Sequence, residues 1–296
     1  MSKITSFQIN FQANNHNHKT TGFTSEYHIL SLSGGKDSTA LALLIKEKYP
    51  EIHEQIEYVF FDTECELEET YDYLNKLEVF LEKPIKRIKP EKSFDYLYSM
   101  YKFLPSIRFR WCTIYMKTET FKKYMDGKIK SGCSKIHLYI GIRADEPERI
   151  ENYQSKNLES EDGILNTRYL LAEEGFFEKD VYNLLETTGI GYPKYYDWRS
   201  RSGCYFCFYQ RKIEWVELLE RHPDLFEKAL QYEKNAGKNF TWCQDMSLEE
   251  LKKPETVAKI KAKHQEKASK HKEDRQTLFD TLAVNDVDKT CLFCHK

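Results

Sequence analysis

The stretch YHILSLSGGKDST, Tyr27 to Thr39, decides the fold of this chain. Its first half, Tyr27 to Leu32, is an apolar run of strand length that ends at a glycine pair, Gly34-Gly35. The residues from Asp37 to Tyr49 then predict a helix. Its apolar face is formed by Ala40, Leu41, Leu44 and Ile45. A strand that passes through glycines into a helix is typical of a phosphate-binding loop, because the backbone can approach phosphate closely and the helix start offers unpaired N–H groups.

The composition of this loop excludes two common phosphate-binding motifs. A Walker A loop needs a glycine where Leu30 stands and a Ser or Thr where Asp37 stands. The dinucleotide pattern Gly-x-Gly-x-x-Gly is also absent here. The charge of Lys36 and the hydroxyls of Ser33, Ser38 and Thr39 nevertheless suit an anion.

Apolar runs and helical patterns alternate after this point. Strands are predicted at 56–61, 84–88 and 136–141, and a helix at 67–81. Past about residue 165 the strand signals fade, and helices are expected at 179–188, 213–220, 224–235 and 252–275. The alternation predicts an α/β fold with a doubly wound, mostly parallel, Rossmann-like sheet and a mainly helical C-terminal part. We expect a polar arm at 1–25, a nucleotide-binding α/β domain at 26–200 and a helical region with cysteine pairs at 201–296.

The overall charge does not indicate a nucleic-acid or membrane partner. The 296 residues carry a formal net charge of only -2, and 40% of them are hydrophobic, enough for a packed core. The N-terminus lacks a signal-peptide pattern, and no apolar run has transmembrane length, so a cytoplasmic protein is expected. A local excess of Lys and Arg at 252–275 leaves a nucleic-acid contact as a weaker possibility.

Eight cysteines include two Cys-x-x-Cys pairs, Cys204/Cys207 and Cys291/Cys294. This spacing lets both sulfurs of a turn face one ion, so the four together could hold a structural zinc. Cys112 follows Arg108 and Arg110, and nearby cations favour a thiolate that can act as nucleophile or metal ligand. Cys65, Cys133 and Cys243 are interpreted as small buried side chains.

Several motifs in chain order carry a family resemblance. The loop Ser33–Ser38 resembles the PP-loop of the adenine-nucleotide α-hydrolase-like superfamily. Phe61-Asp62-Thr63 with Glu68–Tyr71, and Gly141–Glu146 with Arg149, resemble segments of phosphoadenosine-phosphosulfate (PAPS) reductases. The resemblance covers roughly residues 27–215 and reaches Gly203-Cys204-x-x-Cys207.

Two departures qualify this resemblance. Glu64 stands where many members have glycine, and the tail Cys291–Lys296 differs from the reactive Glu-Cys-Gly-x-His segment of assimilatory PAPS reductases. Arg110–Thr113 together with Gly203–Cys207 looks more like the branch of DndC-like sulfur-transfer ATPases of DNA phosphorothioation and their phage-borne relatives. In that branch cysteines of these segments hold an iron–sulfur cluster. The resemblance therefore implies a [4Fe–4S] cluster on Cys112, Cys204, Cys207 and one tail cysteine, with the zinc site as the alternative.

The resemblance also implies a function and a set of site residues. We expect ATP or PAPS as ligand, and sulfur transfer or reduction as the chemistry, with a reductant or sulfur-donor protein as partner. Lys36, Asp37, Arg143 and Arg149 are the candidate catalytic residues: the cations stabilise phosphate or sulfate charge, and Asp37 either caps the helix or orients Mg²⁺. The expected nucleotide-binding residues are Ser33, Gly34, Gly35, Lys36, Asp37, Ser38, Thr39, Asp62, Thr63 and Gly141. The alternatives are an ATP pyrophosphatase that adenylates a nucleic acid for thiolation, and a nucleotide-binding, zinc-stabilised module without turnover.

Overall fold

A computed structural model describes residues 25–154, 163–237 and 240–277 of the chain, with side chains of the last helix described to residue 266. Its centre is a five-stranded parallel sheet in the order β3-β2-β1-β4-β5. The strands are β1 (Ser25–Leu32), β2 (Ile56–Phe61), β3 (Ile85–Ile88), β4 (Cys133–Tyr139) and β5 (Leu165–Arg168). The strand order reverses between β1 and β4, and open α/β sheets bind ligands beyond the carboxyl ends of strands at such a switch point.

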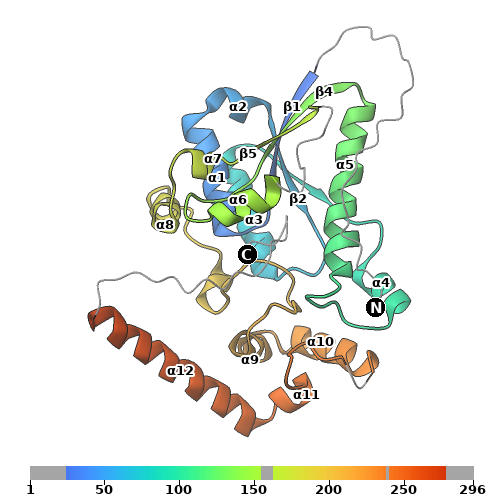
Figure 1. Cartoon of the computed structure of the whole chain (residues 1–296), viewed down its shortest axis with the longest axis vertical. Coiled ribbons are helices and arrows are strands. Elements are labelled where there is room, and N and C mark those ends of the chain that lie inside the picture. The colour runs from blue at the N-terminus through green and yellow to red at the C-terminus, as the bar shows by residue number, and fades with distance from the viewer. Residues whose placement is uncertain (1–24, 155–162, 238–239, 278–296) are drawn as a thin grey trace.

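Helices cover both faces of the sheet (Figure 1). On one face Leu30, Leu32 and Tyr58 pack against helices α1 (Lys36–Lys48), α3 (Glu68–Leu81), α7 (Leu170–Glu173) and α8 (Glu178–Thr187), with α2 (Pro50–Gln55) beside them. On the other face Ile29, Val59 and Leu138 pack against α5 (Glu119–Lys130) and α6 (Pro147–Gln154). The strands that are buried on both faces are nearly continuous apolar runs, as parallel strands require.

A third apolar cluster joins the carboxyl edge of the sheet to the C-terminal helices. It contains Leu67, Phe94 and Trp111 from the first half of the chain, and Trp215 and Phe226 from the second. The elements involved are α4 (Phe94–Tyr101), a π-helical segment η1 (Thr113–Thr118), a 3-10 turn η2 (Lys194–Asp197), α9 (Lys212–Arg221), α10 (Pro223–Asn235), α11 (Leu248–Leu251) and α12 (Pro254–Thr277). Of these elements, α9, α10, α11 and α12 lie at the lower end of Figure 1.

The doubly wound parallel sheet and the helical C-terminal part are confirmed. Strand 56–61 is found as predicted, and most other predicted elements differ from the observed ones by one or two residues. The predicted strand 136–141 instead begins at Cys133 and ends at Tyr139. Strand β5, which pairs with β4 over Leu165–Arg168, was not predicted. None of the described helices has the length and apolarity needed to span a membrane.

Candidate nucleotide site and cysteine pocket

The loop between β1 and α1 is closed by its own hydroxyl groups. The Ser33 N–H donates to Ser38 Oγ at 3.2 Å, the Gly35 N–H donates to Ser33 Oγ at 3.3 Å, and Thr39 Oγ1 donates to the Gly35 carbonyl at 3.0 Å. Gly34 has a φ of +71°, and a β-carbon on it would lie 2.7 Å from the Thr70 methyl group. The two serines and the threonine therefore hold the loop open toward the switch point, in a conformation that requires glycine.

Three charged side chains meet beside this loop. Lys36 Nζ lies 3.1 Å from both carboxylate oxygens of Asp37, and Arg143 Nη1 lies 2.9 Å from Asp37 Oδ1. All three residues are buried, with at most 9% of each exposed. Asp37 does not cap α1, because Gly35 is the N-cap residue and Asp37 lies in the first turn. The carboxylate thus faces the two cations that were predicted to bind phosphate.

Arg143 and Arg149 are joined by an acid. Arg143 Nε contacts Asp145 at 2.8 Å, and Glu146 contacts Arg149 Nη1 at 2.7 Å while lying 3.7 Å from Arg143 Nη1. Burial disfavours the charged form of Arg143, but Asp37 and the two other carboxylates outweigh it and raise its pKa. The structure therefore brings Arg143 to the loop, whereas Arg149 is oriented toward Glu146. Asp145 and Glu146 pair with the neighbouring arginines.

The remaining predicted nucleotide residues lie at the carboxyl ends of β2 and β4. Asp62 follows β2, and its Oδ1 accepts from the Tyr71 hydroxyl at 2.7 Å and from the Glu64 N–H at 2.8 Å. Gly141 follows β4, and a β-carbon there would lie 3.0 Å from the Asp37 carbonyl and the Ser38 nitrogen. Gly141 thus lets the segment after β4 approach the first turn of α1 closely. Glu64 has a φ of +58°, a left-handed conformation that glycine adopts more easily than other residues. This explains why a glycine suits the position.

Sequence reasoning missed four residues of α8 and η2 that complete the wall of the loop. The Lys36 N–H donates to the Tyr196 hydroxyl at 3.3 Å, and the Tyr195 hydroxyl donates to the Gly34 carbonyl at 2.5 Å. Glu178 lies 3.3 Å from Lys36 Nζ, and the Tyr182 ring lies 5.6 Å from it. Burial raises the pKa of both tyrosines of η2, so their hydroxyls stay protonated. No local pattern signalled these contacts, which join positions about 140 to 160 residues apart.

Cys112, Cys204 and Cys207 line one pocket, next to the carboxyl end of β2. Cys112 precedes η1, and the other two belong to the loop before α9. All three are half-buried, whereas Cys65, Cys133 and Cys243 are buried, as expected, and burial raises their pKa. Cys291 and Cys294, the other proposed ligands, lie outside the described residues.

Thr63, just after β2, contacts both Cys204 in this pocket and the buried acid Glu66. Its Oγ1 lies 3.4 Å from Cys204 Sγ and donates to Glu66 Oε1 at 3.0 Å. The Glu66 side chain is only 1% exposed, faces Lys117 Nζ at 3.8 Å and has Cys204 Sγ 3.8 Å from Oε1. Within the described part of the chain its second oxygen, Oε2, has no hydrogen-bond partner. A buried acid with an unsatisfied oxygen beside a thiol fits a pocket that holds a further polar or metallic group.

The sulfurs of Cys112, Cys204 and Cys207 do not form a compact site for a single ion. Among the described residues they do not all lie within 4.8 Å of one another. The alternative zinc set shares only Cys204 and Cys207 with this group. The pocket offers soft sulfur donors in an apolar and aromatic wall, which suit an iron–sulfur cluster as well as zinc.

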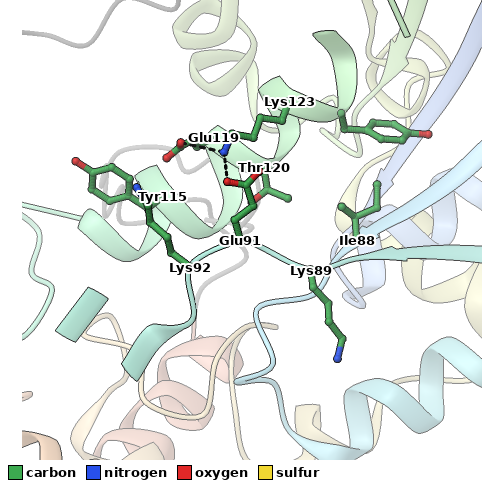
Figure 2. A pocket seen from close by; sticks show the side chains of 9 residues that line it. Ile88, Lys89, Glu91, Lys92, Tyr115, Glu119, Thr120 and Lys123 are labelled. Atoms are coloured by element: carbon green, nitrogen blue, oxygen red, sulfur yellow. Dashed lines mark hydrogen bonds and ion pairs between the residues drawn. The ribbon is translucent and has the colours of Figure 1, made fainter. Parts of the chain in front are cut away.

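Another pocket lies past the end of β3 and contains none of the predicted site residues. Figure 2 shows Lys123 bridging Glu91 and Glu119, at 2.5 and 3.4 Å, across its upper wall. Lys92 Nζ lies over the Tyr115 ring at 5.0 Å. These two cations are thus matched by acids or a ring, and no glycine is among the described residues that line the pocket.

Comparison with known proteins agrees with this geometry. The phosphoadenosine phosphosulfate reductase domain family matches residues 27–210. An uncharacterized protein of Methanocaldococcus jannaschii is 27% identical over 214 residues, which are 70% of this chain and 47% of that protein. An uncharacterized nin region protein of Escherichia phage lambda is 30% identical over 178 residues, 52% of this chain and 56% of that protein. The chain thus spans about half the length of these curated relatives.

Among solved structures, phosphoadenylyl-sulfate (PAPS) reductase from Candida auris, in a phosphate complex, superimposes with a TM-score of 0.41 and 15% identity. The match covers 62% of this chain and 82% of that one. The family match extends over more than half of the chain and includes the loop, the arginine segment and the cysteine pair of the pocket. The chain belongs to the phosphoadenosine phosphosulfate reductase domain family.

Proposed function

We propose that this protein is a PP-loop enzyme that binds ATP or PAPS at the switch point of the sheet and carries out sulfur transfer or reduction. The observation that carries the proposal is the meeting of Lys36 and Arg143 at Asp37, where the segment after β4 approaches the first turn of α1. Two buried cations and the start of α1 form a strong anion site once the Asp37 carboxylate is engaged otherwise.

Asp37 gives this site a requirement for a metal ion. In the described structure its carboxylate neutralises Lys36 and Arg143, so a polyphosphate competes with it for the same cations. A Mg²⁺ ion that binds both Asp37 and phosphate oxygens turns this competition into a bridge. Mg²⁺ would also reduce the charge that develops when an α–β phosphoanhydride breaks.

Cys112, Cys204 and Cys207 are the residues proposed to hold an iron–sulfur cluster, with Cys291 or Cys294 as a further ligand. The alternative is zinc on Cys204, Cys207, Cys291 and Cys294. A cluster held in this pocket would supply electrons or an iron that binds sulfur. With Cys204 bound as a thiolate, the Thr63 hydroxyl would donate to its sulfur instead of to Glu66, and Lys117 would balance the Glu66 charge.

Ligand binding tests the nucleotide site directly. Titration of ATP and PAPS, with and without Mg²⁺, into protein purified without oxygen should show binding of at least one of them. Lys36→Ala and Arg143→Ala should each weaken it at least tenfold, because each removes a buried cation from the phosphate position. Lys46→Ala is the matched control, since Lys46 lies on the same helix and pairs with Glu82 at the surface. Failure of both nucleotides to bind, or wild-type affinity of Lys36→Ala, would refute the proposal.

Product analysis separates the possible reactions. Sulfite and adenosine 3′,5′-bisphosphate indicate PAPS reduction, and AMP with pyrophosphate indicates ATP cleavage. Binding without either product favours the non-catalytic module. Iron, acid-labile sulfide and zinc should be measured in the same protein, and Cys204→Ser should reduce the metal content while Cys133→Ser, at a buried strand position, should not.

A nucleic-acid acceptor is supported by a single feature, the row of lysines on α12. Lys259 and Lys263 are exposed, while Lys261 pairs with Glu220 at 2.6 Å. Binding of tRNA or DNA that weakens steeply with salt would support the adenylating pyrophosphatase. Absence of binding at low salt removes it.

A further inference from the structure

Three side chains with metal-binding atoms lie together on one face of the sheet, two in the first half of β1 and one on β4. His28 and His137 face each other directly in the register of the two strands, and Glu26 precedes His28 by two residues on the same face of the sheet. The candidate ligand atoms of the three side chains all lie within 4.8 Å of one another. The amino end of β1 is at the top of Figure 1, the opposite end of the sheet from the nucleotide loop. No residue of the proposed active site takes part.

The ring nitrogens of both histidines are arranged as in a metal site. His28 Nδ1 lies 2.8 Å from the Tyr139 hydroxyl, and His137 Nδ1 lies 3.2 Å from the side-chain amide of Asn166. Metal-binding histidines usually use one ring nitrogen for the ion and the other for such a hydrogen bond. The Tyr139 hydroxyl can accept from an Nδ1–H group, and so can the amide oxygen of Asn166 after a flip. His28 Nε2 is then available to an ion. His137 Nε2 becomes available when its proton moves to Nδ1 and its hydrogen bond to Glu26 opens.

The chemistry of the three groups suits a cation, because two imidazoles and one carboxylate each offer a lone pair to an ion. Neutral imidazole and carboxylate are the forms that bind metals.

An ordinary ion pair accounts for only part of this cluster. His137 Nε2 and Glu26 Oε2 lie 3.0 Å apart and need no further partner. That pair does not explain His28, whose ring is stacked on His137 with 4.6 Å between centroids and 11° between planes. Two imidazoles so placed repel each other when both are protonated, whereas one cation attracts both nitrogens.

We propose that Glu26, His28 and His137 bind one divalent transition-metal ion, such as Zn²⁺, that clips β1 to β4. Tetrahedral zinc with N and O ligands about 2.0–2.1 Å away spaces its donors about 3.4 Å apart. The stacked rings must therefore rotate until both ring planes point at the ion. Three protein ligands leave the fourth position to water. Two imidazoles and one carboxylate suit Zn²⁺ or Co²⁺ better than Mg²⁺ or Ca²⁺, which prefer oxygen.

Cobalt titration of the full chain, purified without a histidine tag, tests this proposal separately from the cysteine pocket. Thiolate ligands give Co²⁺ an intense charge-transfer band, and nitrogen and oxygen ligands do not. We expect one equivalent of Co²⁺ without that band, retained in Cys204→Ser. His28→Gln and His137→Gln should each weaken this equivalent at least tenfold, and Zn²⁺ should raise the melting temperature of the wild type but not of these variants.

His222→Gln is the matched control, because His222 also pairs with a carboxylate, Glu69, at 2.9 Å but is not part of a three-ligand group among the described residues. It should bind Co²⁺ like the wild type. Melting curves without metal check that His28→Gln and His137→Gln are folded. The proposal is overturned if these variants retain wild-type affinity, or if the wild type binds no Co²⁺ apart from an equivalent with the thiolate band.

Discussion

At the scale of single residues, Gly141 determines how closely β4 approaches the phosphate loop. A β-carbon at this position would lie 3.0 Å from backbone atoms of Asp37 and Ser38, which cannot rotate away. We expect Gly141→Ala to cost about 1–3 kcal/mol of stability by overpacking and to weaken nucleotide binding at least tenfold, because the start of α1 must shift. Thermal melting and nucleotide titration measure the two effects.

Gly127→Ala serves as the control for this substitution. Gly127 lies within α5, and a β-carbon there would have no neighbour within 4 Å. Alanine should therefore stabilise the helix by roughly 0.5–1 kcal/mol and leave nucleotide affinity unchanged. Equal behaviour of the two variants would contradict the role assigned to Gly141.

Glu214 gives a pH-dependent prediction at the same scale. Its buried carboxylate accepts hydrogen bonds from the Ser200 N–H and hydroxyl and from the Arg211 N–H, at 2.8–2.9 Å. Burial raises its pKa, but these bonds and the Arg211 charge outweigh burial and lower the pKa below the ordinary 4.5. The resulting stabilisation is complete above about pH 4.5, the unfolded value, and is lost as pH falls through the folded pKa.

Glu214→Gln should accordingly lower the free energy of unfolding by about 1–3 kcal/mol at pH 7. The difference from the wild type should shrink as the pH is lowered below 4.5. Urea unfolding at pH 7 and pH 4 compares the two proteins. A difference that is the same at both pH values would show that the charge of Glu214 is not what stabilises the loop.

At the scale of elements, η1 places the buried side chain of Lys117 next to Glu66, which lies in the loop before α3. Lys117 and Glu66 have side chains that are 9% and 1% exposed, with 3.8 Å between Nζ and Oε1. Lys117→Met leaves the Glu66 charge buried without this partner, which should cost about 3–5 kcal/mol. Adding Glu66→Gln should recover most of the loss. Chemical unfolding of both variants and the wild type tests this, and a stable Lys117→Met protein would contradict it.

Helices and strands with a regular pattern of apolar residues were predicted well from the sequence. Short elements, and elements that form only by pairing with another segment, were predicted less well. The segment Tyr27–Thr39 was recognised because strand, glycine turn and helix each have a local signal. Strand β5 was missed because Leu165–Arg168 is a four-residue edge strand whose identity depends on pairing with β4. The π-helical turn η1 before α5 has no sequence signature of its own. Whether a helical turn forms i→i+4 or i→i+5 hydrogen bonds depends on the tertiary contacts around it.

The candidate site was predictable only in part for the same reason. The loop and Arg143 lie where their strands end, which the sheet topology dictates. The orientation of the Arg149 side chain depends on its hydrogen bond to Glu146. Glu146 therefore competes with the proposed nucleotide for the Arg149 guanidinium. Tyr195 and Tyr196 reach the loop from a distant turn, and no periodicity reports such a contact.

At the scale of the whole molecule, the α/β part and the C-terminal helices share an apolar cluster. Phe94 and Trp111 pack with Phe206, Trp215 and Trp242 across the boundary proposed at residue 200. We expect Trp111→Ala and Trp215→Ala each to reduce the free energy of unfolding by about 3–5 kcal/mol. Each variant should still melt in one transition, at a lower temperature than the wild type. Calorimetry measures this, and two separate transitions would instead support independent domains.

The central place of β1 has a consequence for synthesis on the ribosome. The strand pairs with β2 soon after it emerges, but its other edge waits for β4, more than a hundred residues later. At roughly 5–20 residues per second, this edge stays open for about 5–20 seconds. An open apolar edge invites pairing with neighbouring nascent chains. We therefore expect chains that are stalled before residue 133 to aggregate or to recruit chaperones, and chains that are stalled well past residue 139 to escape both.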